Sequence, residues 1–132
     1  MDPSPRATGR RPKKGRLSRS AEFDRVYRQG RSFGNRQLVL HAFARPDAGE
    51  LREAPRLGLS VSRKVGGAVD RNLVKRLVRE AFVDVAGDLP PQLDVVVVAR
   101  PEALELAERD GLDGVRASLA ELVARVAQAD AA

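Results

Sequence analysis

The chain has 132 residues, with no cysteine, no tryptophan and one histidine, so it is long enough for one domain with an aliphatic core and has no thiols for disulfides or zinc. Residues 1–80 carry 20 basic and 8 acidic side chains, a net charge of +12, whereas residues 81–132 carry 4 and 10, a net charge of −6; together these give the overall +6. This polarity favours a polyanionic partner, nucleic acid before an anionic membrane.

Residues 1–16 are basic and rich in proline but have almost no large apolar side chains. They predict a disordered basic tail that serves either solubility or non-specific attraction to phosphate. The tail lacks the apolar segment of a signal peptide or an anchor, and no run approaches the roughly 20 apolar residues of a membrane span. We therefore expect a cytoplasmic protein with no membrane partner, in which residues 17–128 form a single domain whose charge favours nucleic acid.

The first structured part of the chain is expected to be a helix followed by a strand. Residues 21–29 follow two candidate caps, Ser18 and Ser20, and place Phe23, Val26 and Tyr27 on one helical face before a glycine. Residues 36–44 alternate as a strand, and residues 46–55 form a polar loop.

Residues 56–62 predict a second strand with two unlike faces. Leucine and valine point one way, whereas Gly58, Ser60 and Ser62 leave the other face nearly flat, so that a ligand backbone could lie close to it. A loop containing Arg63 and Lys64 leads into a predicted helix over residues 68–86.

This central helix is amphipathic and strongly basic. Its apolar residues fall on one arc, and Leu73 lies on that buried side. The opposite arc carries four cations and an amide, with only Glu80 to offset them: Arg71, Asn72, Lys75, Arg76 and Arg79. Such rows suit phosphate and sugar contacts, although periodicity alone is equally compatible with a solvated charged face.

The C-terminal part completes a mixed fold. Residues 93–99 include four consecutive valines and predict a buried central strand. Helices are expected over 101–109 and 112–128, followed by a frayed terminus at 129–132. The expected order is helix, two strands, helix, strand and helix, and a third short strand beside the first two is a further possibility. This order predicts an α/β (α+β) two-layer sandwich in which helices pack on a small mixed sheet.

No set of residues predicts catalysis by this chain alone. The Gly66–Gly67 pair lacks the remainder of a phosphate-binding loop, and neither Ser60 nor Ser62 stands in a nucleophile elbow. No carboxylate spacing suggests a metal site. What remains is a binding surface to which Phe23, Tyr27, His41 and Phe43 could add stacking, although core packing is the simpler interpretation of each aromatic ring.

The central segment resembles a known family. Residues 56–82, which read RLGLSVSRKVGGAVDRNLVKRLVREAF, are similar to the signature of the bacterial ribonuclease P protein component. Residues 22–32, 38–41 and 94–101 are similar to the same family, and the likeness covers roughly residues 16–128. It implies a ribosomal-protein-like sandwich with a left-handed β-α-β crossover, contrary to the usual rule.

The resemblance also implies a function. The protein would be a subunit of an endoribonuclease that removes the 5′ leader of precursor tRNA, with ribonuclease P RNA and precursor tRNA as partners and no required protein partner. The RNA would perform the hydrolysis with Mg²⁺ that it mainly binds itself. The RNA-contacting residues would be the five on the basic helix arc together with Lys64, and the leader cleft would be lined by Phe23, Tyr27 and His41.

Two residues depart from the family pattern. Leu73 stands where a third basic-motif residue is usual, so we exclude it from the contact surface. His41 stands where tyrosine is frequent, so stacking there should be weaker or sensitive to pH. Two alternative functions stay open at this point: a ribosomal or other structured-RNA-binding protein, and a DNA-binding regulator, which lacks the preceding helix of a helix-turn-helix.

Overall fold

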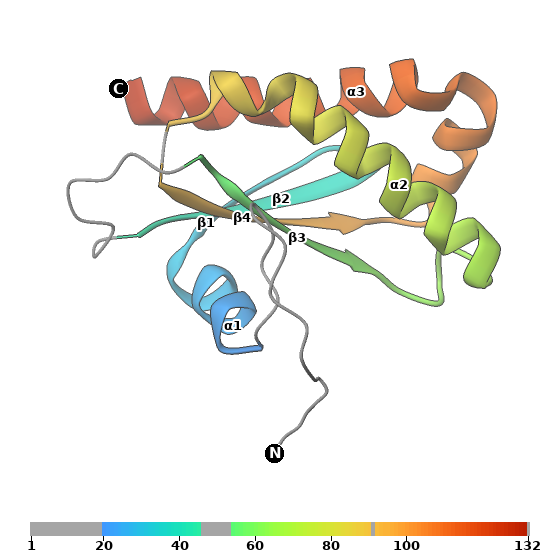
Figure 1. Ribbon diagram of the computed structural model, residues 1–132, viewed down its shortest axis with the longest axis horizontal. Coiled ribbons are helices and arrows are strands. Elements are labelled where there is room, and N and C mark those ends of the chain that lie inside the picture. Colours follow the sequence, from blue (N-terminus) through green and yellow to red (C-terminus); the bar gives the residue numbers. More distant parts are fainter. Residues whose placement is uncertain (1–19, 46–53, 91, 132) are drawn as a thin grey trace.

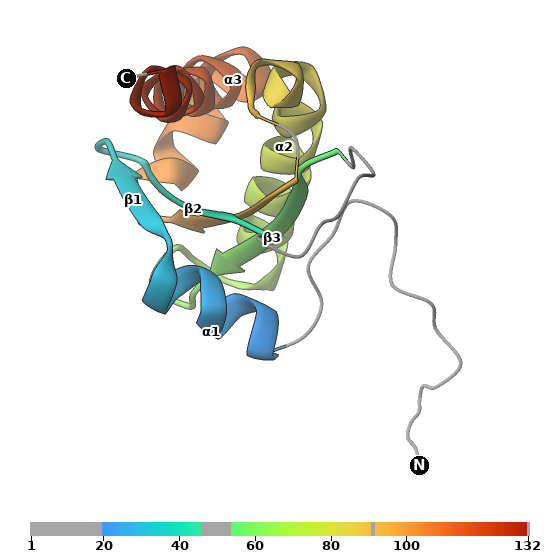
Figure 2. The same cartoon turned by 90° about the vertical axis from the view of Figure 1, so that its left-hand side faces the viewer.

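A computed structural model describes residues 20–45, 54–90 and 92–131. The predicted basic tail, the cap Ser18 and most of the predicted polar loop lie outside these residues. The elements in chain order are α1 (Ser20–Gln29), β1 (Arg31–Gly34), β2 (Leu38–Ala44), β3 (Arg56–Val61), α2 (Ala68–Val85), the 3₁₀ turn η1 (Ala86–Asp88), β4 (Leu93–Ala99) and α3 (Glu102–Ala131). Helices α2 and α3 cover one face of the sheet and α1 lies on the other (Figures 1 and 2).

The four strands form one mixed sheet in the order β1-β2-β4-β3. Strand β4 is antiparallel to β2 and parallel to β3, so β3, α2 and β4 make a parallel β-α-β unit. Both strands run toward the right in Figure 1, with β3 on the near side, and the two views place α2 above them. Viewed from the helices with the strands pointing upward, β4 lies to the left of β3, so the crossover is left-handed, as the resemblance implied.

The core is divided by the sheet into two unequal parts. The larger part lies between the sheet and helices α2 and α3, and contains alternate residues of β2 together with the odd-numbered valines of β4. The smaller part lies under α1, where Val26 packs on Val96 with Phe23 and Phe43 around them. Strand β4 is the central strand, and six of its seven residues are buried, as its run of valines predicted.

The element boundaries differ from the expected ones at several ends, and α1 begins at Ser20, so this candidate cap belongs to the helix itself. A short strand, β1, precedes a turn at Asn35, so β2 begins at Leu38 rather than at residue 36. Strand β3 ends one residue early, at Val61. The break expected between residues 109 and 112 is confirmed: α3 consists of two helical parts separated at Gly111, whose φ of 60° and ψ of −146° are non-helical and suit a glycine. Helix α3 continues to Ala131, beyond the expected end at residue 128.

The junction of α1 and β1 depends on a glycine for steric reasons. Gly30 donates its backbone N–H to the carbonyl oxygen of Val26 at 2.9 Å, which closes the last turn of α1. A Cβ atom at this position would overlap the carbonyl oxygens of both Val26 and Ala42. The absence of a side chain therefore lets the chain turn tightly from the helix into the sheet beneath it.

Candidate nucleic-acid interface

Helix α2 presents the predicted basic arc because its apolar arc is buried. It begins after Gly67, which has extended backbone angles and no capping side chain, and Asp70 lies in its first turn. The buried residues of the helix are Val74, Leu77, Val78, Ala81, Phe82 and Val85. Leu73 is partly buried and packs against the same core, which confirms that it does not belong to the exposed surface.

The polar residues of α2 stand on the side facing solvent. Asn72 and Arg76 are exposed, while Arg71, Lys75 and Arg79 are half-buried. Arg71 Nε donates to the carbonyl oxygen of Gly67 at 3.4 Å, and Arg79 also interacts within the chain. Within the described ranges, Lys75 and Arg76 form no ion pair, so their charges are available to an external anion.

Lys64 lies in the exposed loop between β3 and α2. The loop is held as a turn, because the N–H of Val65 donates to the Ser62 carbonyl at 3.1 Å and the N–H of Lys64 approaches Ser62 Oγ at 3.3 Å. Val65 is buried in the main core. The loop is therefore anchored by buried Val65, and it exposes Lys64 shortly before the helix that carries the other predicted cations.

The second predicted set, the aromatic residues, gathers on the opposite face of the sheet. The rings of Tyr27 and His41 meet in a T-shaped contact, with centroids 4.9 Å apart and planes at 89°, and Phe23 follows at 6.5 Å from Tyr27. Tyr27 is 41% exposed, so part of its side chain is accessible. The structure therefore brings Phe23, Tyr27 and His41 together as one row, which we call the aromatic row.

Core packing accounts for part of the aromatic residues. Phe23 and Phe43 pack against the small core under α1, and the guanidinium of Arg25 lies 5.2 Å from the centre of the Phe43 ring. Partial burial also lowers the pKa of His41 below its usual value, because desolvation disfavours the imidazolium. This shift favours the neutral imidazole at the ring that Tyr27 contacts.

Beside the aromatic row the sheet is low in relief. The strand register sets His41 opposite Val96 and Val96 opposite Gly58, and the next level on the same face holds Val39, Val98 and Ser60. On β3 this face carries the predicted glycine and serine, but Gly58 is buried and Ser60 is partly exposed, so the face is less open than the sequence predicted.

The predicted residues therefore occupy two surfaces rather than one. Helix α1 and the aromatic row lie on one face of the sheet, and α2 lies on the other (Figure 2). The loop with Lys64 connects β3, whose small residues belong to the first surface, to α2, which carries the second. Strand β3 is an edge strand, so an elongated ligand could contact both surfaces by passing around it.

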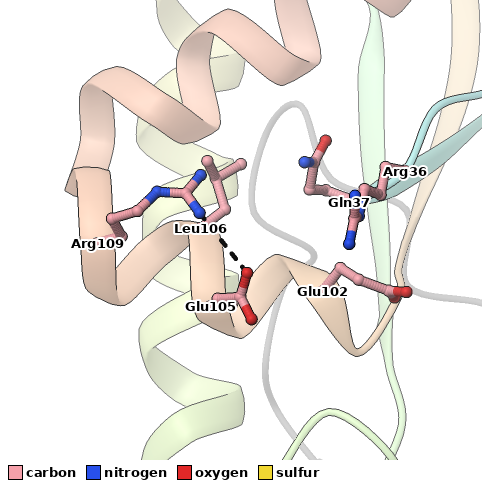
Figure 3. A pocket seen from close by; sticks show the side chains of 6 residues that line it. All are labelled: Arg36, Gln37, Glu102, Glu105, Leu106 and Arg109. Atoms are coloured by element: carbon pink, nitrogen blue, oxygen red, sulfur yellow. Dashed lines mark ion pairs between the residues drawn. The ribbon is translucent and has the colours of Figure 1, made fainter.

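The best-defined pocket lies away from both surfaces. It has a volume of about 140 Å³ and lies between the start of β2 and the first turns of α3, lined by Arg36, Gln37, Glu102, Glu105, Leu106 and Arg109 (Figure 3). Arg109 and Glu105, one turn apart on α3, are paired at 3.6 Å on its helical side. None of the predicted contact residues lines this pocket.

Sequence reasoning missed a cluster of charges under α1. Asp94, in β4, is fully buried and is contacted by arginines from three segments. The hydrogen bond to Asp94 is the main reason that the pKa of Arg56 is raised. An aspartate interrupting a run of apolar strand residues was the available signal, because a buried carboxylate needs partners.

Comparison with known proteins decides the family. The family model described as Ribonuclease P matches residues 12–126. The chain belongs to the ribonuclease P protein family. It is 44% identical to the ribonuclease P protein component of Bacillus pumilus over 71% of this chain and 76% of that protein. It is 42% identical to the component of Rhodococcus opacus over 84% of this chain and 90% of that protein.

Solved structures of the family have the same fold. The ribonuclease P protein of Staphylococcus aureus superposes with a TM-score of 0.72 at 33% identity, covering 86% of this chain and 95% of the other. That of Thermotoga maritima gives 0.71 at 34% identity, covering 83% and 96%. The chain is therefore a protein subunit of ribonuclease P, a ribonucleoprotein of tRNA processing, and these matches favour this function over the ribosomal and DNA-binding alternatives.

Two further findings concern the described residues only. No helix among them is long and apolar enough to cross a bilayer. No three histidine or carboxylate side chains among them converge as metal ligands. Mg²⁺ prefers oxygen ligands, whereas the candidate interface offers cations, an amide and aromatic rings. The residues of this surface therefore do not fit a magnesium site.

Proposed function

We propose that the chain binds the ribonuclease P RNA through α2 and the Lys64 loop, and the 5′ leader of precursor tRNA through the aromatic row. In this proposal the RNA partner and the Mg²⁺ that it mainly binds carry out the hydrolysis that removes the leader. Membership of the ribonuclease P protein family supports the assignment, and the unpaired cations on the outer side of α2 are the observation that carries it.

Phosphate binding by α2 follows from charge and spacing. Lys75 and Arg76 form no ion pair among the described residues, and Asn72 lies exposed one turn before Arg76. Residues three and four apart share one side of a helix, so the arc offers several donors to one stretch of backbone. Arginine can hold a phosphate in bidentate fashion, and an amide can donate to a sugar hydroxyl or a phosphate oxygen.

Leader binding by the aromatic row follows from exposure and shape. The exposed part of the Tyr27 ring gives a base a surface on which to stack, and the small, partly exposed Ser60 on the same face lets the strand lie close to the sheet. His41 holds the Tyr27 ring through the T-shaped contact between them. Single-stranded RNA is recognised in this way, through unpaired bases on aromatic side chains beside cations.

The experiment that tests leader binding compares Tyr27→Ala with Tyr27→Phe in the reconstituted holoenzyme. Removing a stacking ring costs about 1–3 kcal/mol, which corresponds to a loss of about 5- to 150-fold in affinity for precursor tRNA. The Phe variant keeps the ring and should retain the affinity, and mature tRNA should bind equally well to all three proteins. Equal losses for precursor and mature tRNA would show that Tyr27 only stabilises the fold.

A further inference from the structure

Asp94 is the buried charged residue of the described chain, with no solvent exposure. It belongs to β4 and lies opposite Phe43 and Arg56 in the register, on the face that α1 covers. Burial of a carboxylate is costly unless cations and hydrogen bonds compensate it. The neighbours of Asp94 therefore have to be held in place.

Three guanidinium groups provide this compensation. Arg56 makes a bidentate pair, with Nε 2.9 Å from Oδ1 and Nη2 2.9 Å from Oδ2. Arg45 Nε lies 3.6 Å from Oδ1, and Arg25 Nη2 lies 3.5 Å from Oδ2. Arg56 Nη1 also pairs with Glu22 Oε2 at 3.0 Å. Because Arg25 and Glu22 both belong to α1, the cluster connects this helix to the sheet at two points.

Apart from these charged pairs, helix α1 is held mainly by the small core around Val26, with Phe23 packed beside it. It has ten residues, and Val26 is its one buried side chain; helices this short are marginal without tertiary contacts. At 100° per residue, Glu22 and Arg25 lie to one side of Val26, and Phe23 and Tyr27 lie to the other. A rotation of α1 about Val26 would therefore separate the charged pairs and the aromatic row together.

We propose that Asp94 is a positioning residue for leader binding, which acts through Arg56 and Arg25 to fix the rotation of α1 so that Tyr27 stands against His41. This inference rests on the proposed function of the aromatic row. Asp94 itself is buried beneath α1 and contacts no substrate in this account. Its effect on RNA would come entirely from where it holds Tyr27.

The composition of the chain allows a direct measurement of that position. Tyr27 is the only tyrosine, the chain has no tryptophan, and His41 is the only histidine. Tyrosine emission and its quenching by acrylamide therefore report on Tyr27 alone, and the NMR signals of the two rings report on the surroundings of Tyr27 and His41. These readouts need no RNA and no activity.

The test uses three variants in the full chain and the holoenzyme. Asp94→Asn removes the central charge, and Glu22→Gln breaks the second link while leaving Asp94 paired with Arg56. The matched control is Asp84→Asn, since Asp84 pairs with Arg116 at the same 2.9 Å but between α2 and α3. Asp94→Asn and Glu22→Gln should increase the quenching of Tyr27 and shift the His41 signals, and Asp84→Asn should change neither.

The RNA measurement should follow the same order. For Asp94→Asn the affinity for precursor tRNA should fall at least about fivefold, the lower limit of a lost stacking contact, while mature tRNA binds as before. If Asp94→Asn fails to fold, Glu22→Gln decides the question, because it leaves no buried charge unpaired. Unchanged Tyr27 quenching in the folded variants would overturn the inference, and so would equal losses for both RNAs.

Failure of the proposed function gives a different pattern. If the wild-type holoenzyme does not distinguish precursor from mature tRNA, the aromatic row does not bind the leader. The emission of Tyr27 in the free protein still shows whether Asp94 positions α1. If Tyr27 moves in the variants but the affinity for precursor tRNA stays the same, the inferred role of Asp94 in leader binding is contradicted.

Discussion

Neutralising Lys75 and Arg76 together should weaken RNA binding in a way that depends on salt. Both side chains stand on the solvent side of α2, and neither is engaged by a carboxylate in the part of the chain that the structure describes. Glutamine is about as good a helix former as lysine or arginine. The double variant Lys75→Gln/Arg76→Gln should therefore keep the helix and lose two phosphate contacts.

The magnitude follows from the number of contacts. Each phosphate contact contributes roughly 0.7 to the slope of log affinity against log salt for single strands and about 0.9 for duplex. Loss of two contacts should flatten the slope by about 1.4 to 1.8. If Lys64, Arg71 and Arg79 are also engaged, the wild-type slope should be about −3.5 to −4.5.

The assay is equilibrium binding of ribonuclease P RNA over a range of salt concentrations. The control is Arg109→Gln/Arg116→Gln, which makes the same change in net charge on α3. Arg109 is already paired with Glu105 and Asp110, and Arg116 with Asp84 and Asp113. The salt slope of this control variant should therefore stay close to that of the wild type. Equal flattening by both double variants would refute a specific role for α2 and leave only net charge.

Two further predictions concern α1 and its surroundings. The pKa of His41 should lie below 6.5 in the folded protein, and an NMR titration of this single histidine measures that pKa. The contribution of neutral His41 to stability should therefore be complete above pH 6.5 and be lost as the pH falls through the folded pKa. Tyr27→Ala should raise the pKa of His41 by exposing its ring. Gly30→Ala should destabilise the fold by about 1–3 kcal/mol in urea unfolding through overlap with two carbonyl groups. The control Gly87→Ala, whose Cβ would meet no atom within 4 Å, should not destabilise the fold in this way. Similar losses of unfolding free energy in the two variants would show that overlap is not the cause.

Much of the helical layer and the central strand could be predicted because the signals are local. The spacing of apolar residues in α2 predicted which arc is buried, including Leu73. The four valines of β4 predicted a strand buried on both faces. The crossover hand could be expected only from the resemblance, because the general rule for parallel β-α-β units favours the opposite hand.

The remaining features depend on contacts between distant residues. Strand β1 has four residues with little apolar character. It is fixed by pairing with β2 and by Phe33, whose ring centre lies 5.9 Å from the guanidinium of Arg31 and 5.8 Å from that of Arg125. The partners of Asp94 come from α1, the end of β2 and β3, so no local pattern reveals them. The separation of the aromatic row from the basic arc likewise arises from packing on opposite faces of the sheet.

The most direct test of the account is leader removal measured across a Mg²⁺ titration with ribonuclease P RNA alone, with the protein alone and with both. We expect the protein freed of RNA to cleave nothing. We expect it to lower the Mg²⁺ concentration that the RNA requires, because the cations of α2 and Lys64 would screen crowded phosphates that otherwise need additional Mg²⁺. Cleavage by RNA-free protein, or a Mg²⁺ curve for the RNA that the protein leaves unmoved, would contradict this account.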